Sequence, residues 1–454
     1  MSDFDDDFAE QGQAVYEALL ARTGEAAPQP RLEPTRRVLD LLGDPQRAFP
    51  IIQLTGTNGK TSTSRLIESI LRAYGLRTGL FTSPHLVRFN ERIVLDGEPI
   101  SNEALARNWA DIEPYVQMVD AELEQAGEVP LTFFEVLTVL AYASFADAPI
   151  DVGVIEVGMG GEWDSTNVAD AQIAVFTPID LDHVARLGST IAEIARTKAG
   201  IIKPAATVVT AAQHPDALAE IRKAAERDEA PIVAQDVDFA LTADHVAVGG
   251  QVLSVRGRAG EYTDLYLPLY GDHQGQNAAV AIAAVETFLG NGSQPLANDP
   301  LVEGLSEVLS PGRLQLVGIE PTVLVDAAHN PHGARALAAA LGKYFDFAET
   351  VFVIGVLGDK DAEGILSVLA PLAARIHITA PSSERSIPVD ELADRATALV
   401  GPGLIYPFDS TEEAVFAARD WANEGSSRLV VVTGSVVLAG EILDLAEAEE
   451  WKKA

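Results

Sequence analysis

The sequence predicts an α/β fold with two units: a doubly wound, mostly parallel sheet domain that also carries a small antiparallel sheet, followed by a smaller α/β domain. Short apolar runs rich in β-branched residues recur along the chain, and segments with helical spacing of apolar residues separate them. Strands that alternate with helices in this way form parallel sheets with helices on both faces. One junction between a strand and a helix contains segment 55–62, in which two glycines precede a lysine.

The first unit starts with an amphipathic helix around residues 15–20 and, after several prolines, a short helix at 38–42. The strands expected after them are short and apolar, and they lie at 49–54, 78–82, 92–95, 151–157 and 171–177. The helices expected between the strands have apolar residues three and four positions apart, and they cover 60–74, 101–124, 133–145 and 191–195.

Residues 230–270 differ in character, because short alternating runs with many glycines predict small antiparallel strands. An Ala-rich helix, a linker-like stretch and a short helix follow at 274–289, 291–295 and 301–309. Strands then recur at 322–326, 351–356, 374–379 and 428–433. They predict a second, Rossmann-like unit of normal domain size. We therefore expect one domain at 1–309 and another at 310–454.

The composition excludes several classes of function. The chain has no cysteine, which rules out disulfides, thiolate catalysis and Cys-ligated zinc. The net charge is −35, from 32 basic and 67 acidic residues, which argues against binding to nucleic acid or to anionic membranes. The acidic start is the opposite of a secretory signal, and no uncharged apolar run reaches membrane-spanning length. We expect a cytoplasmic monomer whose partners are small molecules and whose acidity serves solubility or a salty cytoplasm.

Segment 55–62 has the context of a phosphate-binding loop. Gly56 and Gly59 let the backbone approach an anion, and the helix that follows directs its N-terminal dipole at the same place. Lys60 can reach the β- and γ-phosphates, and Thr61 can bind Mg²⁺. The spacing is one residue shorter than the usual pattern, so the alternative is an ordinary Gly-rich turn. Without nucleotide, the Lys60 side chain should face solvent.

Polar residues follow the other predicted strands of the first unit. Ser83, Glu156 and His183 come at or just beyond strand ends, where ligands bind in parallel sheets. Together with Thr61 they would provide oxygen and imidazole ligands near the γ-phosphate, and hard oxygen ligands suit Mg²⁺. Taken singly, Glu156 could instead cap a helix and His183 could be a satisfied loop histidine. Their common location favours a metal site.

In the second unit, Asp326 at a strand end could hold a ribose hydroxyl, and His329 could contact phosphate or an incoming amine. Arg313 follows the linker and is placed to reach a nucleotide held by the first unit. The alternative for Asp326 is ordinary capping of a strand end. Lys198 ends a predicted helix, and composition alone favours a lysine that stabilises the helix dipole there.

Eight short motifs succeed one another between about residues 30 and 440. They are GTNGKT at 56–61, SPHL at 83–86, EVGMGG at 156–161, Asp182-His183 with Leu187-Gly188, KAGIIKP at 198–204, His273-Gln274 with Asn277, PGR at 311–313, and DAAHNP at 326–331. As an ordered set they resemble the folylpolyglutamate synthases of the Mur ligase superfamily, including the bifunctional dihydrofolate synthase form.

The resemblance implies roles for individual residues. ATP phosphates would bind to Gly56, Asn58, Gly59, Lys60, Thr61 and Ser62, adenine to Asn277, and the rest of the nucleotide to Arg313 and Asp326. Mg²⁺ would occupy two sites, with ligands from Thr61, Ser83, Glu156 and His183. Lys198 would be carbamylated by CO₂ and support the second ion. L-Glutamate would be handled by His329 and Ser435, and the pteroate part of the substrate would contact Phe134, Asp164 and Ser165.

The activity implied is an ATP-dependent ligase that adds glutamate to folates, and also to dihydropteroate, through an acyl phosphate; Lys60, Lys198 and His329 would be its catalytic residues. Three departures occur: Lys60-Thr61-Ser62 where the family often has Gly after the lysine, Ala327 in place of a Gly, and Pro34 where Arg is expected. One alternative is another Mur-type ligase, but the 54 residues before Thr55 are too few for a UDP-binding domain. The other is a nucleotide-binding regulatory module without catalysis.

Overall fold

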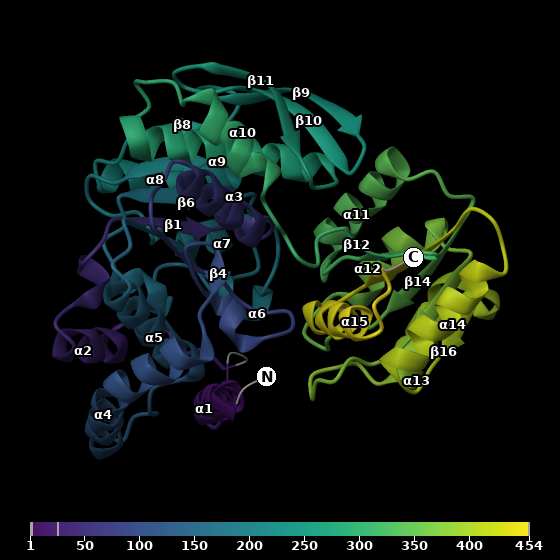
Figure 1. Ribbon diagram of the computed structural model, residues 1–454, viewed down its shortest axis with the longest axis horizontal. Coiled ribbons are helices and arrows are strands. Elements are labelled where there is room, and N and C mark those ends of the chain that lie inside the picture. Colours follow the sequence, from purple (N-terminus) through teal and green to yellow (C-terminus); the bar gives the residue numbers. More distant parts are fainter. Residues whose placement is uncertain (1–2, 25–26, 453–454) are drawn as a thin grey trace.

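The computed structural model describes residues 3–24 and 27–452, and the first unit in it is built on an eight-stranded sheet (Figure 1). The strand order is β4-β3-β2-β5-β1-β6-β7-β8. The strands are β1 (Ile51–Thr55), β2 (Thr78–Phe81), β3 (Ile93–Leu95), β4 (Glu98–Pro99), β5 (Val152–Glu156), β6 (Ile173–Phe176), β7 (Thr207–Thr210) and β8 (Ile232–Ala234). In this order, each strand from β2 through β5, β1, β6 and β7 to β8 pairs in parallel with the next. β3 pairs antiparallel with both β2 and β4.

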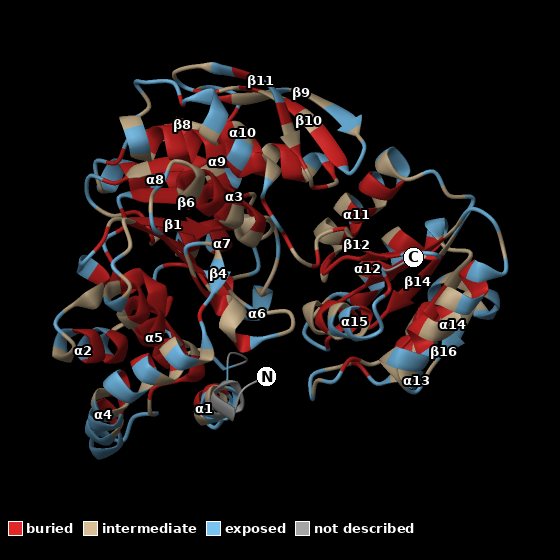
Figure 2. Ribbon diagram, in the orientation of Figure 1, coloured by how far each residue is buried: buried red, intermediate tan, exposed pale blue. Residues whose placement is uncertain are grey.

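The central strand β1 is buried along its whole length because helices cover both faces of the sheet (Figure 2). Successive side chains of a strand point to opposite faces. Ile52 and Leu54 therefore join one core, and Ile51 joins another. The first core packs against α3 (Lys60–Ala73), α9 (Asp272–Gly290) and α10 (Asn298–Ser306). The opposite face is covered by α1 (Asp3–Leu20), α2 (Glu33–Leu41), α4 (Asn102–Ala126), α5 (Phe133–Asp147), α7 (Ile191–Ala199) and α8 (Pro215–Arg227).

A small antiparallel sheet lies beside α9 and has the order β11-β10-β9. Its strands are β9 (Ala240–Ala247), β10 (Gly250–Arg256) and β11 (Glu261–Leu267). The sequence predicted this sheet but assigned the whole of 230–270 to it. The structure corrects that assignment, because β8 pairs in parallel with β7 and ends the large sheet. Three residues are too short for alternation to separate the two kinds of strand.

The second unit has a six-stranded sheet with the order β12-β13-β17-β14-β15-β16. Its strands are β12 (Gln315–Ile319), β13 (Thr322–Val325), β14 (Glu349–Ile354), β15 (Arg375–Ile378), β16 (Ile405–Pro407) and β17 (Arg428–Thr433). One face is covered by α11 (Pro331–Tyr344), α12 (Ala362–Leu369) and α13 (Val389–Val400), and the other by α14 (Thr411–Asn423) and α15 (Val436–Ala448). All pairs are parallel except β12 with β13.

Two edge strands of this sheet were missing from the sequence prediction. β12 forms a hairpin with β13, and β16 is a half-exposed strand of three residues. Edge strands lack the continuous apolar run that marks a buried strand, so their pattern is weak. The helix expected at 301–309 lies instead at Asn298–Ser306.

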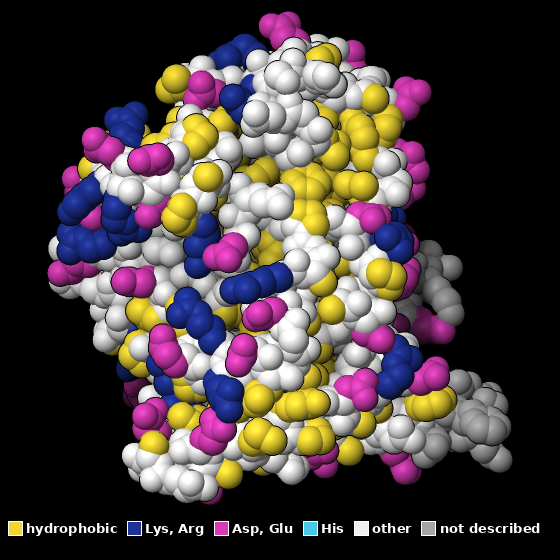
Figure 3. Space-filling model, turned by 90° about the vertical axis from the view of Figure 1, so that its left-hand side faces the viewer, with side chains coloured by type: hydrophobic (Ala, Val, Ile, Leu, Met, Phe, Trp, Pro, Cys, Tyr) yellow, Lys and Arg dark blue, Asp and Glu magenta, His cyan; other side chains and the backbone are white. Residues whose placement is uncertain are grey.

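Acidic residues are not gathered in one place on the face of the molecule that Figure 3 shows. On the face shown in Figure 3, Asp and Glu side chains lie between Lys and Arg side chains rather than in one patch. This distribution agrees with a role in solubility. In the part of the chain that the structure describes, no helix is both long enough and apolar enough to cross a membrane.

Candidate functional site

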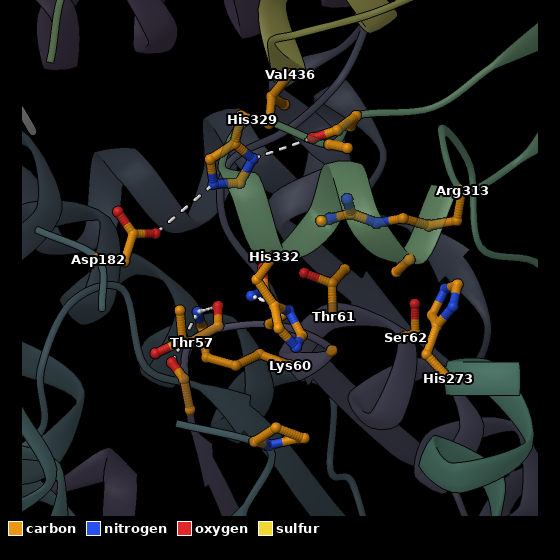
Figure 4. Close-up of a pocket in the computed structure, with 18 of the residues that line it drawn as sticks. Thr57, Lys60, Thr61, Ser62, Asp182, His273, Arg313, His329, His332 and Val436 are labelled. Atoms are coloured by element: carbon orange, nitrogen blue, oxygen red, sulfur yellow. Dashed lines mark hydrogen bonds and ion pairs between the residues drawn. The ribbon is translucent and has the colours of Figure 1, made fainter. Parts of the chain in front are cut away.

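Two adjoining pockets lie between the units, where the carboxyl ends of both sets of parallel strands meet. The first has a volume of about 320 Å³ and the second of about 380 Å³. Ser83, His183 and His329 line both, so the pockets share a wall. The first pocket is also lined by Gly56, Asn58, Gly59, Lys60, Thr61, Ser62, Glu156, Lys198, Asn277, Arg313 and Asp326 (Figure 4). The second is also lined by Phe134, Asp164, Ser165 and Ser435. The structure thus brings together every residue that the sequence singled out.

The predicted phosphate loop connects β1 to α3, the arrangement that the sequence indicated. Gly56 has φ +152°, and a Cβ atom there would lie 1.9 Å from Thr177 Oγ1. Gly59 has φ +87°, and a Cβ atom there would lie 2.7 Å from Asn277 Oδ1. Both positions therefore need glycine. The N-terminus of α3 opens into the first pocket, where its unpaired N–H groups can bind an anion.

Two lysines converge on this loop from different elements. Lys60 Nζ donates to the carbonyl oxygens of Gly56 and Thr57, at 3.2 and 3.3 Å. The expectation that Lys60 faces solvent is therefore wrong, because the side chain folds back on its own loop. Lys198 Nζ, from the end of α7, donates to Gly56 O at 2.7 Å. Burial, and then the nearby charge of Lys60, lowers the pKa of Lys198 to about 7.

The end of β5 supplies a buried carboxylate. Thr61 Oγ1 lies 3.0 Å from each carboxylate oxygen of Glu156, which is 1% exposed. Burial raises the pKa of Glu156, against the opposing effects of Lys60 and of the Thr61 hydrogen bond. A carboxylate beside a loop hydroxyl is a donor set that suits Mg²⁺. In residues 3–24 and 27–452 no three His, Asp or Glu side chains surround one point, so hydroxyl groups or a ligand would have to complete a metal site.

Asp182 links the two units through charge. Lys360 Nζ, from the loop after β14, lies 2.9 Å from Asp182 Oδ1, and both side chains are largely buried. The rings of His183 and His329 lie 4.0 and 3.9 Å from the other carboxylate oxygen. Burial disfavours the ionised form of Asp182, but the electrostatic effects of His183 and Lys360 favour it more strongly, so the pKa of this carboxyl group lies well below its usual value. Burial lowers the pKa of both histidines to about 4, so both are neutral near pH 7.

On the other side of the first pocket, α9 and the second unit approach the same loop (Figure 4). Asn277 Nδ2 donates to Gln274 Oε1 at 3.1 Å, and Ser62 Oγ lies 3.0 Å from Ser310 Oγ in the connection between the units. Asp326 accepts from the backbone N–H groups of Leu314 and Ala328, at 2.9 Å each. It therefore caps the strand end, as the alternative interpretation held, and it also lines the pocket.

The predicted substrate residues of the second pocket are held by internal hydrogen bonds. Asp164 accepts from Met159 N at 2.9 Å, and burial raises the pKa of its carboxyl group. Ser165 Oγ lies 2.7 Å from Thr138 Oγ1, and Ser435 caps α15 by accepting from Leu438 N at 3.0 Å. The Phe134 ring fills the space beside Gly158, where a Cβ atom would lie 2.5 Å from it. Asp164, Ser165 and Ser435 therefore line the second pocket, and their hydrogen bonds to neighbouring residues hold its wall in place.

Two polar residues of the site, Lys360 and His332, were not singled out from the sequence. Lys360 was not considered, although it follows β14 and the rule that ligands bind beyond strand ends would have found it. His332 Nδ1 lies 2.8 Å from Asn58 Nδ2 of the phosphate loop, and its position in α11 gave no signal in the sequence.

Family models give the class of protein that this fold and site define. The Mur ligase middle domain matches residues 54–285, which include the phosphate loop, β5 and α9. The glutamate ligase domain of the Mur ligases matches residues 312–436, which include Arg313, Asp326, His329 and Ser435. The chain is thus a Mur-type ligase in architecture, with both of its units represented.

Individual relatives narrow the class. The dihydrofolate synthase/folylpolyglutamate synthase of Mycobacterium tuberculosis is 43% identical over 438 residues, which cover 91% of this chain and 90% of the relative. The folylpolyglutamate synthase of Lacticaseibacillus casei is 35% identical over 91% of this chain and 95% of its own. The chain belongs to the folylpolyglutamate synthase/dihydrofolate synthase family.

Solved structures agree with this over nearly the full length. Mycobacterium tuberculosis folylpolyglutamate synthase complexed with ADP and AMPPCP is 42% identical, with a TM-score of 0.92 over 97% of this chain and 99% of that one. Escherichia coli FolC in complex with DHPP and ADP is 30% identical, with a TM-score of 0.81 over 98% of both chains. The predicted fold class is thereby confirmed, including the small antiparallel sheet and the second α/β unit.

Proposed function

We propose that this protein is an ATP-dependent ligase that adds L-glutamate to folates through an acyl phosphate. The observation that carries this proposal is the shared wall of the two pockets, because a nucleotide in the first and a carboxylate substrate in the second would meet at Ser83, His183 and His329. The substrate carboxylate attacks the γ-phosphorus and ADP leaves. The neutral glutamate amine then attacks the acyl carbon, phosphate leaves, and the nitrogen loses one proton, so that one ATP is cleaved to ADP and phosphate for each amide formed.

The residues of the first pocket act by charge and position. Gly56, Asn58, Gly59 and Ser62 bring backbone and hydroxyl donors to the phosphates, and Lys60 exchanges its loop carbonyls for phosphate oxygens. Asn277 is assigned to adenine, and Arg313 and Asp326 to the nucleotide from the second unit. Thr61, Ser83, Glu156 and His183 would hold Mg²⁺ at two sites, and the bound ions would neutralise charge that develops on the phosphoryl oxygens. His183 suits this role because it is neutral.

Lys198 is proposed to carry a carbamate. Its amine is buried, and a pKa of about 7 leaves a large neutral fraction. The Nζ lone pair would attack the carbon of CO₂ and one proton would leave, and the resulting carboxylate-like group would provide an oxygen ligand for the second Mg²⁺. Lys198→Ala should be nearly inactive and partly rescued by acetate. Lys203→Ala, whose amine instead donates to Asn167 O, should lose less activity and gain nothing from acetate. High activity of Lys198→Ala without any added carboxylate would overturn the assignment.

The second pocket is assigned to the acceptor and to glutamate. Phe134, Asp164 and Ser165 would line the pteroate part, and His329 and Ser435, with the N-terminus of α15, would handle the incoming glutamate. We propose that dihydropteroate is accepted as well as folates. Support comes from the bifunctional names of the relatives and from the DHPP complex of the Escherichia coli protein.

The proposal is tested by ADP release with Mg-ATP and L-glutamate in the presence of dihydropteroate, of tetrahydrofolate, or of buffer alone. Both acceptors should stimulate release well above buffer, and omission of glutamate should abolish amide formation. A rate of ADP release that is the same with and without acceptor and glutamate would indicate a nucleotide-binding regulatory module. Stimulation by tetrahydrofolate alone would restrict the activity to polyglutamylation. We further propose that the protein works as a cytoplasmic monomer with domains 1–309 and 310–454, which sedimentation and limited proteolysis can check.

A further inference from the structure

Helix α11 lies along the seam between the two units, and its ends contact different parts of the first unit (Figure 1). At its N-terminus, Asn330 Nδ2 lies 3.2 Å from Asn58 Oδ1, and His332, in the first turn of the helix, contacts the same loop residue. About three helical turns later, Lys343 Nζ lies 2.7 Å from Asp244 Oδ2 and 2.6 Å from Asp272 Oδ1. His332 and Lys343 are eleven residues apart and therefore lie on one face of the helix.

The two carboxylates belong to elements of the first unit that pack against each other. Asp244 lies on β9 of the small sheet, and Asp272 is the first residue of α9. Their side chains converge on one point, where they would repel each other without a cation between them. Both carboxylates accept hydrogen bonds from the ammonium group of Lys343, which belongs to the second unit. The two carboxylates therefore form a site on the first unit that binds a lysine of the second unit.

The neighbouring residue strengthens the same contact. Tyr344 OH lies 3.1 Å from Asp272 Oδ1 and 3.1 Å from Gln251 Oε1 of β10. Gln251 Nε2 donates to Leu269 O and Gly271 O, and so fixes the turn that leads into α9. Tyr270, in that turn, packs against the rings of Tyr344 and Phe345. The end of α11 therefore rests on a platform made by the small sheet and the start of α9.

We infer that Lys343 is a positioning residue that clamps α11 to this platform and so holds the second unit closed over the two pockets. With the far end fixed, Asn330 and His332 stay on the phosphate loop, the loop after β13 stays on the shared wall of the pockets, and the loop after β14 stays on the wall of the second pocket. The small antiparallel sheet then has a function, because it provides one of the two carboxylates on which closure depends. Only the kinetic part of this inference rests on the proposed ligase activity.

The closed state can be measured without catalysis, because the chain has no cysteine and labels can be placed at will. Spin labels at Met118→Cys on α4 and Leu399→Cys on α13 would report the separation of the units, since both side chains are exposed. Lys343→Met should shift the distance distribution towards longer values, with and without Mg-AMPPCP. Lys223→Met, on the exposed face of α8, is the matched control and should leave the distribution unchanged.

The kinetic expectation follows from the energies of half-exposed ion pairs, and we expect kcat/KM for glutamate to fall about two- to tenfold in Lys343→Met. Exchanging the charges of Lys343 and Asp244 distinguishes loss of the contact between the units from a general loss of stability. Lys343→Glu should open the units further, and adding Asp244→Lys should restore both the distances and kcat/KM, since a lysine again lies between two carboxylates.

Unchanged label distances in Lys343→Met, even with a lower melting temperature, would reduce Lys343 to a structural residue and overturn the inference. Failure of the charge exchange to recover the distances of Lys343→Glu would do the same. If the wild-type protein shows no glutamate-dependent ADP release, the proposed function fails, while the distance measurements still decide on the clamp.

Discussion

The buried amine of Lys198 makes the stability of the protein depend on pH in a way that one substitution should remove. The side chain is 4% exposed, and its Nζ donates to Gly56 O at 2.7 Å. Burial first, and the nearby Lys60 second, lowers its pKa to about 7. In the unfolded chain the same amine has a pKa of about 10.4. Lys198→Met keeps most of the side-chain volume and removes the titrating group.

The sign of the effect follows from proton binding. Between about pH 7 and pH 10 the unfolded chain holds the Lys198 proton and the folded chain has lost it, so the free energy of unfolding rises with pH. Below about pH 7 the penalty for burying the amine is constant and largest. Integrated from about pH 7 to about pH 10, the gain is about 3–4 kcal/mol. Lys198→Met should lack this gain.

The assay is urea denaturation of both proteins at several pH values from 7 to 10 in CO₂-free buffer, followed by circular dichroism. Titrating groups that do not interact with Lys198, such as Lys203, are present in both proteins, and their contributions cancel in the difference. The stability of Lys198→Met relative to wild type should decline by about 3–4 kcal/mol across this range. A difference that does not change with pH would show that Lys198 is not a buried neutral amine, and the basis for carbamylation would be lost.

Three further predictions follow from the same structure. Lys60→Ala should lower kcat by about a hundredfold or more because a phosphate-binding cation is lost, with an unchanged circular dichroism spectrum; near wild-type turnover would contradict the ATP assignment. Arg313→Ala should weaken Mg-ATP binding by about tenfold in calorimetry, and equal affinity would remove this residue from the nucleotide site. Gly304→Ala should destabilise by about 1–3 kcal/mol, since its Cβ atom would lie 2.6 Å from the Cα atom of Ile70, whereas Gly342→Ala, with nothing within 4 Å, should be neutral or stabilising in thermal unfolding.

The sequence was sufficient for those parts of the fold that leave a strong local pattern. β1 and β5 are mostly apolar and are buried along their whole length, and the glycines after β1 have positive φ angles that other residues rarely adopt. The edge strands β12 and β16 and the short β8 were missed or misassigned, because a sheet can recruit short half-exposed segments that have no pattern of their own.

For the site, the rule that ligands bind beyond strand ends explains which residues could be found. It predicted that Ser83, Glu156 and His183 lie near one another, and all three line the first pocket. Their chemical roles stay predictions. The contact between Lys360 and Asp182 could not be anticipated, because it depends on how two separate sheets face each other and not on either segment alone.

The opposed carboxyl edges of the two sheets also bear on the length of the product. The N-termini of α3, α11 and α15 all open into the gap between the units, and each carries a partial positive charge. The chain as a whole has a net charge of −35. A growing polyglutamate tail gains one carboxylate per residue, and once it extends beyond the gap each new charge meets repulsion instead of attraction. Electrostatic repulsion would then limit the length of the polyglutamate tail, and added salt, which screens the surface charge, would allow longer tails.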